Sequence, residues 1–156
     1  MKKIRAYLFW IIIAEATGAL SGWLIRDSVE LYREVIEKPP LSPPAILFPI
    51  VWTILYAMMG VGAAKIALSD PSQQRDSSLQ LFLWQLAVNF LWPIFFFRMQ
   101  CFGGALLWLA LLWGLVIWMI RSFHQVSTRA AKLQIPYLLW LTFAAYLNAG
   151  VYLLNP

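Results

Sequence analysis

The chain has 156 residues, of which 62% are hydrophobic and only 12% charged, and its formal net charge is +5. A soluble domain is closer to half apolar and a quarter charged, and a disordered chain cannot carry this much apolar surface, so both classes are excluded. Four stretches contain no Asp, Glu, Lys or Arg, and each is long enough to cross a hydrocarbon layer of about 30 Å as a helix. These stretches are residues 39–64, 77–97, 99–120 and 133–156.

Together with an apolar N-terminal segment, these stretches predict an all-α membrane protein, a bundle of five transmembrane helices that uses nearly the whole chain as one domain, 1–156. The first helix follows three cations and is interrupted by Glu15. A cleaved signal peptide is the alternative for this segment, because Ala14-Glu15-Ala16 has the small-x-small pattern of a cleavage site, but apolar residues resume through Ile25 and favour a retained helix. The predicted helices are about residues 6–25, 45–68, 79–97, 103–120 and 133–154.

Residues 26–44 form the longest polar connection. Asp27-Ser28 can cap a short amphipathic helix in this segment. The proline-rich run from Lys38 to Pro44 then ends that helix, because proline cannot continue a helix and stiffens the chain. We predict that this connection is a lid over a pocket between the helices.

The distribution of cations predicts the orientation in the membrane. With five spans, one side receives eight Lys and Arg residues and the other receives four. The positive-inside rule then predicts a multi-pass protein of the cell membrane whose N-terminus lies in the cytoplasm. Because the cations lie mostly at helix ends, they are typical of membrane anchors, and no nucleic-acid partner is expected.

Three of the predicted helices carry an aromatic stripe with small or amide neighbours when residues are placed at about 100° per residue. An amide inside a membrane must point inward to find a partner, so the stripes with amides should face the bundle interior. If the stripes converge, they line a flat aromatic pocket for a planar, largely apolar ligand; ordinary packing faces are the alternative. The stripes are Pro49, Trp52, Tyr56, Gly60 and Ala63; Gln85, Asn89, Trp92 and Phe96; and Tyr137, Trp140, Ala144 and Asn148.

Conventional catalytic and metal-binding patterns are not found in the sequence. The single cysteine, Cys101, and the single histidine, His124, exclude an intrachain disulfide and a multi-cysteine or paired-imidazole metal site within one chain. No paired carboxylates or Ser/His/Asp set fall at membrane depth, so neither a metal nor a cofactor is expected. Glu15 is either a functional carboxylate or a hydrogen-bonded structural group, and the Gly18–Gly22 pair can serve internal packing or dimerisation.

The second predicted helix and the segment before it carry a specific signature. Residues 48–60 read FPIVWTILYAMMG and follow Lys38-Pro39 and Ser42-Pro43-Pro44, which together resemble the signature of the TspO/translocator protein family, the tryptophan-rich sensory proteins or peripheral benzodiazepine receptors. Residues 85–92 are similar to the third-helix motif of that family, and residues 136–148 are similar to its fifth-helix motif. The resemblance covers nearly the whole chain in the family's order.

This resemblance implies a five-helix bundle, usually a homodimer in membrane lipid, that binds porphyrins and benzodiazepine-type ligands and acts as a receptor or sensor for tetrapyrrole or stress responses. Two alternatives use the same pocket. One is a light-dependent porphyrin-degrading enzyme in which Trp52 and Trp140 are catalytic, because an indole can donate an electron to an excited porphyrin. The other is a transporter of porphyrins or lipophilic ligands. Porphyrin is thus a ligand rather than a cofactor, and the candidate ligand-binding residues are Tyr32, Pro43, Phe48, Trp52, Tyr56, Gln85, Asn89, Trp92, Tyr137, Trp140, Ala144 and Asn148.

The sequence also departs from the family pattern. Leu41 and Ile46 stand where the family often has tryptophan, so the loop is less aromatic. Pro93 directly follows Trp92 and is expected to shift the kink of the third helix. The segment after Tyr152 lacks the basic residue of a cholesterol motif, so sterol binding is not predicted.

Overall fold

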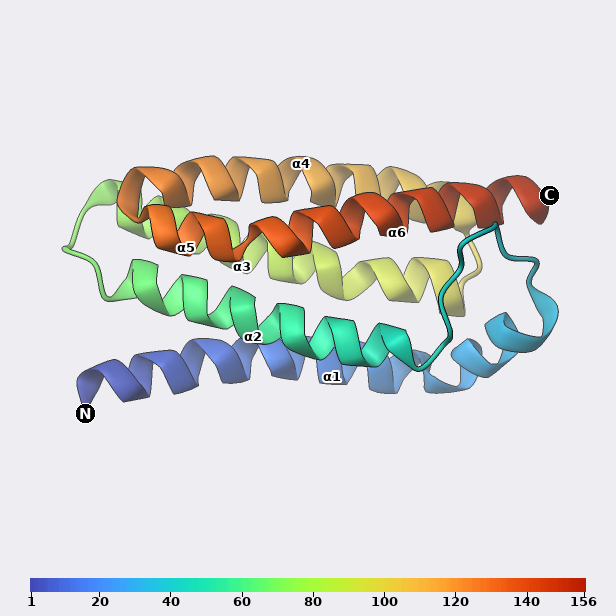
Figure 1. The fold of residues 1–156 in the computed structure, drawn as a ribbon, viewed down its shortest axis with the longest axis horizontal. Helices are drawn as coiled ribbons and strands as arrows, with labels where there is room; N and C mark the ends of the chain where they lie inside the picture. Colours follow the sequence, from blue (N-terminus) through green and yellow to red (C-terminus); the bar gives the residue numbers. More distant parts are fainter.

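Five helices of the computed structural model, which describes residues 1–156, are long and apolar enough to cross a membrane. Figure 1 shows them side by side, with the N-terminus at one end of the bundle and the C-terminus at the other. The all-α, five-helix architecture predicted from the sequence is thus confirmed. The elements are α1 (Lys2–Val35), α2 (Leu47–Ala67), α3 (Gln73–Pro93) with its π-helical continuation η1 (Ile94–Arg98), α4 (Phe102–Val126), the short α5 (Thr128–Leu133) and α6 (Ile135–Leu154).

Helix α1 is longer than the sequence predicted. It runs without interruption to Val35, whereas a helix ending near Ile25 and a separate short helix were expected. Residues 26–35 contain no proline or glycine, so nothing breaks the helix before the proline run that starts at Pro39. The connection between α1 and α2 is therefore residues 36–46, and it lies at the end of the bundle that also holds the C-terminus (Figure 1).

Helices α3 and α4 also extend past the predicted ends. A charge-free stretch indicates which residues can lie inside the membrane, but a helix can continue beyond them. Helix α3 begins after Ser72, whose side chain caps it by accepting a hydrogen bond from the Arg75 backbone N–H at 3.0 Å. Helix α4 continues through Arg121 and His124 to Val126. This end of the bundle also holds the N-terminus and α5, and we call it the N-terminal end.

Pro93 changes the geometry of the third helix. Proline has no N–H group and cannot donate the usual backbone bond, so regular α-helix ends there and η1 follows in the π form. The Met99 N–H donates to the Ile94 carbonyl at 2.9 Å, a spacing of five residues. The shift expected from the Trp92-Pro93 sequence is thus a π-helical turn.

Two glycines allow α1 and α2 to pack closely. A Cβ at Gly60 would lie 2.4 Å from the Cα of Ile11, and one at Gly18 would lie 2.3 Å from the Tyr56 ring. Gly18 therefore serves internal packing, whereas Gly22 has open space around it. Glu15 is half-buried on the same helix and forms no ion pair.

Large apolar side chains cover the outside of the bundle. Leu107 is 75% exposed, Trp84 66% and Leu139 64%, on three different helices. A soluble protein rarely exposes such a continuous apolar surface, and here it matches five spans of membrane-crossing length. The chain is a multi-pass membrane protein.

Candidate ligand-binding site

Four buried polar side chains from α2, α3 and α6 form one hydrogen-bonded chain in the bundle interior. The Tyr56 hydroxyl donates to the Asn89 Oδ1 at 3.0 Å, and the Asn89 Nδ2 donates to the Tyr137 hydroxyl oxygen at 2.6 Å. The Tyr137 hydroxyl in turn donates to the Gln85 Oε1 at 2.7 Å. We call these four residues the polar chain, and each is 5% exposed or less.

The sequence positions these groups for simple reasons. Gln85 and Asn89 are four residues apart on α3 and therefore share a helix face. Gly18 has no side chain, so the Tyr56 ring lies against α1 and its hydroxyl reaches α3. The inward orientation predicted for both amides is confirmed. Because every hydroxyl of the polar chain has a partner, the network holds α2, α3 and α6 in one arrangement.

Three half-buried aromatic residues, Phe48, Trp52 and Trp140, lie beside the polar chain, and we call them the aromatic seam. The Trp52 ring centroid is 5.5 Å from that of Tyr56 and 6.1 Å from that of Tyr137. The rings of Phe48 and Trp140 meet edge to face at 5.8 Å. The backbones of α2 and α6 approach closely at few positions, because these rings stand between them.

Two side chains carry buried polar atoms without a hydrogen-bond partner. One is Trp140, whose indole Nε1 is buried in the seam without an acceptor. The other is Gln134, which precedes α6 and packs against Gly62 with its amide unbonded. Sequence reasoning missed Gln134, since nothing in its local pattern marks it as buried.

Two other predicted site residues form a separate cluster between α3, α4 and α6. The Trp92 Nε1 donates to the Asn148 Oδ1 at 3.0 Å, and the Asn148 Nδ2 donates to the Phe102 carbonyl at 2.8 Å. Ala144 is buried one turn before Asn148. Trp92 and Asn148 are therefore bonded to each other and to the backbone, and no hydrogen bond joins this cluster to the polar chain.

Tyr32, near the end of α1, is also held apart from the polar chain. Its ring packs against Phe96 at 5.6 Å and Phe97 at 5.1 Å between centroids. The Lys38 ammonium lies 4.9 Å from the centre of the same ring. Tyr32 thus connects α1 to η1 and to the start of the loop.

Residues 36–46, the loop between α1 and α2, lie at the C-terminal end of the bundle and are bonded to α6 and the residue that follows it. Pro39 is buried, and a Cβ at Gly150 would lie 2.4 Å from the Pro39 Cβ, so only glycine leaves room for the ring. The Tyr146 hydroxyl donates to the Pro40 carbonyl at 2.7 Å. Asn155 accepts from the Glu37 N–H at 3.1 Å and donates to the Glu37 carbonyl at 2.9 Å. We call this loop the lid; Pro43 lies within it, half-buried.

We expect Asn155→Ala to loosen the lid without unfolding the bundle. The change removes the two hydrogen bonds to Glu37, each contributing about 1 kcal/mol, so local opening of the lid should become roughly 30-fold more frequent. Hydrogen–deuterium exchange of the peptide covering residues 36–46 measures this directly. Gln73→Ala, at the opposite end, should leave that exchange unchanged, and equal exchange in both variants would show that Asn155 does not hold the lid.

The structure therefore defines a polytopic helical membrane protein with a buried polar chain, an aromatic seam beside it and a proline-rich loop at one end of the bundle. The TspO/MBR family model matches residues 9–154. A tryptophan-rich protein TspO of Chlorobaculum tepidum is 35% identical over 99% of this chain and 99% of its own length. A tryptophan-rich sensory protein of Cereibacter sphaeroides is 37% identical over 96% of this chain and 92% of its own length. The translocator protein of Bos taurus is 40% identical over 84% of this chain and 79% of its own length. This chain belongs to the TspO/MBR family.

Proposed function

We propose that this chain is a membrane receptor that binds a porphyrin, or a similarly planar benzodiazepine-type ligand, at the aromatic seam. The observation that carries the proposal is the Trp140 indole N–H, a buried donor without an acceptor in a wall of aromatic rings. A buried polar group usually has a partner, and a ligand carboxylate or ring nitrogen would supply one here. Flat aromatic walls with a few hydrogen-bonding groups suit a planar apolar ligand.

Binding at the seam requires the aromatic rings to separate. In the structure Phe48 lies against Trp140, and Trp52 lies against Tyr56 and Tyr137, so the site is closed by its own side chains. A planar ligand would insert between α2 and α6, where the two backbones already stand apart, and stack on Trp52 and Trp140. The polar chain beneath would set how deep it enters.

The lid supplies a cation for an acidic ligand. The Lys38 ammonium donates to the carbonyls of Arg33 at 3.1 Å and Ile36 at 3.2 Å, which holds it at the start of the lid. A propionate of a porphyrin could replace these bonds with a charge-assisted one. We therefore assign Lys38 to the acidic edge of the ligand.

The proposed role is that of a sensor whose output depends on ligand occupancy. A relative that is 37% identical is named a tryptophan-rich sensory protein, which supports this role. We further propose that the protein lies in the cell membrane with its N-terminus in the cytoplasm, as the cation distribution predicts. A homodimer is part of the proposal, and Gly22 offers open space for a close helix contact.

Trp140→Phe tests the binding site, because it keeps an aromatic ring and removes the N–H. We expect about a tenfold rise in the dissociation constant for protoporphyrin, corresponding to the loss of one hydrogen bond to a charged or strong acceptor. The measurement is the shift of porphyrin absorbance during a titration of purified protein in the dark. Trp113→Phe is the matched control, since Trp113 is exposed on α4 and bonds Thr142 instead.

Equal affinities for wild type, Trp140→Phe and Trp52→Ala would show that the seam is not the binding site.

The same samples under illumination test the enzymatic alternative. A loss of porphyrin absorbance that disappears in Trp52→Phe and Trp140→Phe while binding persists would assign these two tryptophans a photochemical role.

A further inference from the structure

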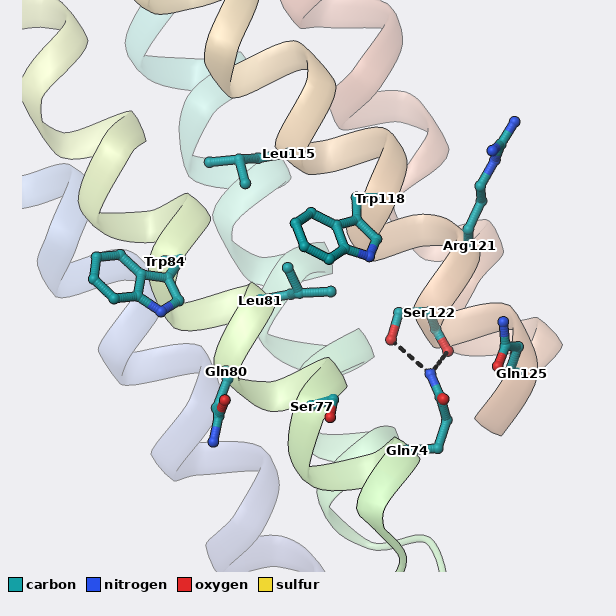
Figure 2. A pocket seen from close by; sticks show the side chains of 10 residues that line it. All are labelled: Gln74, Ser77, Gln80, Leu81, Trp84, Leu115, Trp118, Arg121, Ser122 and Gln125. Carbon is teal, nitrogen blue, oxygen red and sulfur yellow. Dashed lines mark hydrogen bonds between the residues drawn. The ribbon is translucent and has the colours of Figure 1, made fainter.

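The outer surface of the bundle is hollowed between α3 and α4, near the N-terminal end and on the lipid-facing side. This α3–α4 groove has a volume of about 700 Å³, and its lining includes Gln74, Leu81, Trp84, Leu115, Trp118 and Arg121 (Figure 2). Trp84 is 66% exposed and Trp118 is 61% exposed. These tryptophans do not contribute to the polar chain or the aromatic seam, so the groove is a separate feature.

The groove is polar at one end and apolar at the other. Figure 2 shows Gln74 and Gln125 at the end nearest the α2–α3 connection, and Leu115 and Trp84 farther along the helices. The polar end is fixed by a part-buried contact, in which the Gln74 Nε2 donates to the Ser122 Oγ at 2.9 Å. A phospholipid has the same order of groups, with a polar head at the membrane surface and apolar chains below it.

A second hollow adjoins the first and adds positive charge. It has a volume of about 630 Å³, shares Arg121 and Gln125 with the groove, and is also lined by His124 and Lys132. No Asp or Glu lines either hollow. The ion pairs of the structure involve Arg33 and Arg75, so Arg121 and Lys132 have no carboxylate partner.

We propose that the α3–α4 groove and the adjoining hollow bind one anionic phospholipid. Its phosphate lies between Arg121 and Lys132, with His124 beside it, and an acyl chain follows the apolar surface of Trp118 and Leu115. The charge of the site is what selects this occupant: cations without carboxylate partners at a membrane surface attract anionic headgroups, and tryptophans are favoured at that depth.

The test compares lipids that differ only in headgroup charge. Native mass spectrometry of the purified full-length protein, with phosphatidylglycerol and phosphatidylcholine of identical acyl chains, gives the occupancy of each. We expect phosphatidylglycerol to bind more tightly, and Arg121→Gln and Lys132→Gln each to reduce its affinity about fivefold while leaving phosphatidylcholine unchanged. Arg98→Gln, exposed at the opposite end of the bundle, is the matched control and should have no effect.

Several outcomes would overturn the proposal. Equal affinity for the two lipids, or an unchanged preference in the Arg121→Gln/Lys132→Gln double variant, would show that charge at this site does not select lipid. Displacement of the lipid by millimolar inorganic phosphate would make the hollow a site for the free anion. A shift from dimer to monomer in Trp84→Ala and Trp118→Ala would make the groove a contact between two copies. Retained selectivity in Arg121→Lys, which keeps the charge, supports the proposal.

Discussion

Asn89→Leu is expected to lower the stability of the purified protein by about 2–3 kcal/mol and to weaken porphyrin binding at least tenfold. Asn89 is 1% exposed and joins α2 to α6 by accepting from Tyr56 and donating to Tyr137. A single hydrogen bond inside a membrane protein contributes about 0.6 kcal/mol on average. Leucine, however, leaves the Tyr56 hydroxyl without its acceptor and the Tyr137 oxygen without its donor, and each stranded buried group costs about 1–3 kcal/mol.

Thermal unfolding in detergent measures the first effect, and porphyrin titration measures the second. Tyr56→Phe is the informative comparison, because it removes one bond and strands one acceptor, the Asn89 Oδ1, where Asn89→Leu strands two groups; it should cost about 1 kcal/mol. Gln73→Leu, exposed in the first turn of the same helix, controls for the change of residue type. A stability for Asn89→Leu equal to that of Tyr56→Phe would mean that Asn89 does not couple the three helices.

Gly60→Ala is expected to lower the stability of the purified protein by a comparable amount, through packing alone. The added Cβ would lie 2.4 Å from the Cα and 2.7 Å from the N of Ile11, and backbone atoms cannot move aside as a side chain can. Helices α1 and α2 must therefore separate. Overpacking of this kind costs about 1–3 kcal/mol and occasionally more, which exceeds the gain of about 1 kcal/mol that alanine brings to a helix.

Gly114→Ala is the matched control, because it is also a helical glycine but has nothing within 4 Å of its added Cβ. It should be neutral or stabilising in the same unfolding assay. Gly18→Ala meets the Tyr56 ring instead of backbone and should weaken porphyrin binding by displacing the tyrosine hydroxyl from Asn89. Equal melting temperatures for Gly60→Ala and Gly114→Ala would contradict the close approach of α1 and α2.

The sequence alone determined the membrane class, the number of spans and the inward faces of the helices. Charge-free stretches and helical periodicity are local properties, so they are visible without a structure. Gln85 and Asn89 illustrate this: an amide at membrane depth must find a partner inside the protein, which settles its direction. The motif around Trp52 and Tyr56 added the family resemblance, which implies the same pocket that the three aromatic stripes already predicted.

The same local signals could not set the ends of α1. The apolar stretch of the sequence ends at Ile25, but the helix continues to Val35, because helix formation depends on the backbone and residues 26–35 contain no proline or glycine. Charge marks where the membrane ends, and proline marks where the helix ends. The lid is therefore shorter than the sequence predicted.

Only the tertiary structure decided which inward-facing groups meet. Periodicity gives the face of a helix but not its height or rotation against its neighbours, so Asn89 could have paired with Asn148 as well as with Tyr137. The structure separates Trp92 and Asn148 into their own cluster and leaves the Trp140 N–H without an acceptor. It also joins Asn155 to Glu37 across 118 residues of sequence, a contact that depends on the packing of the whole bundle.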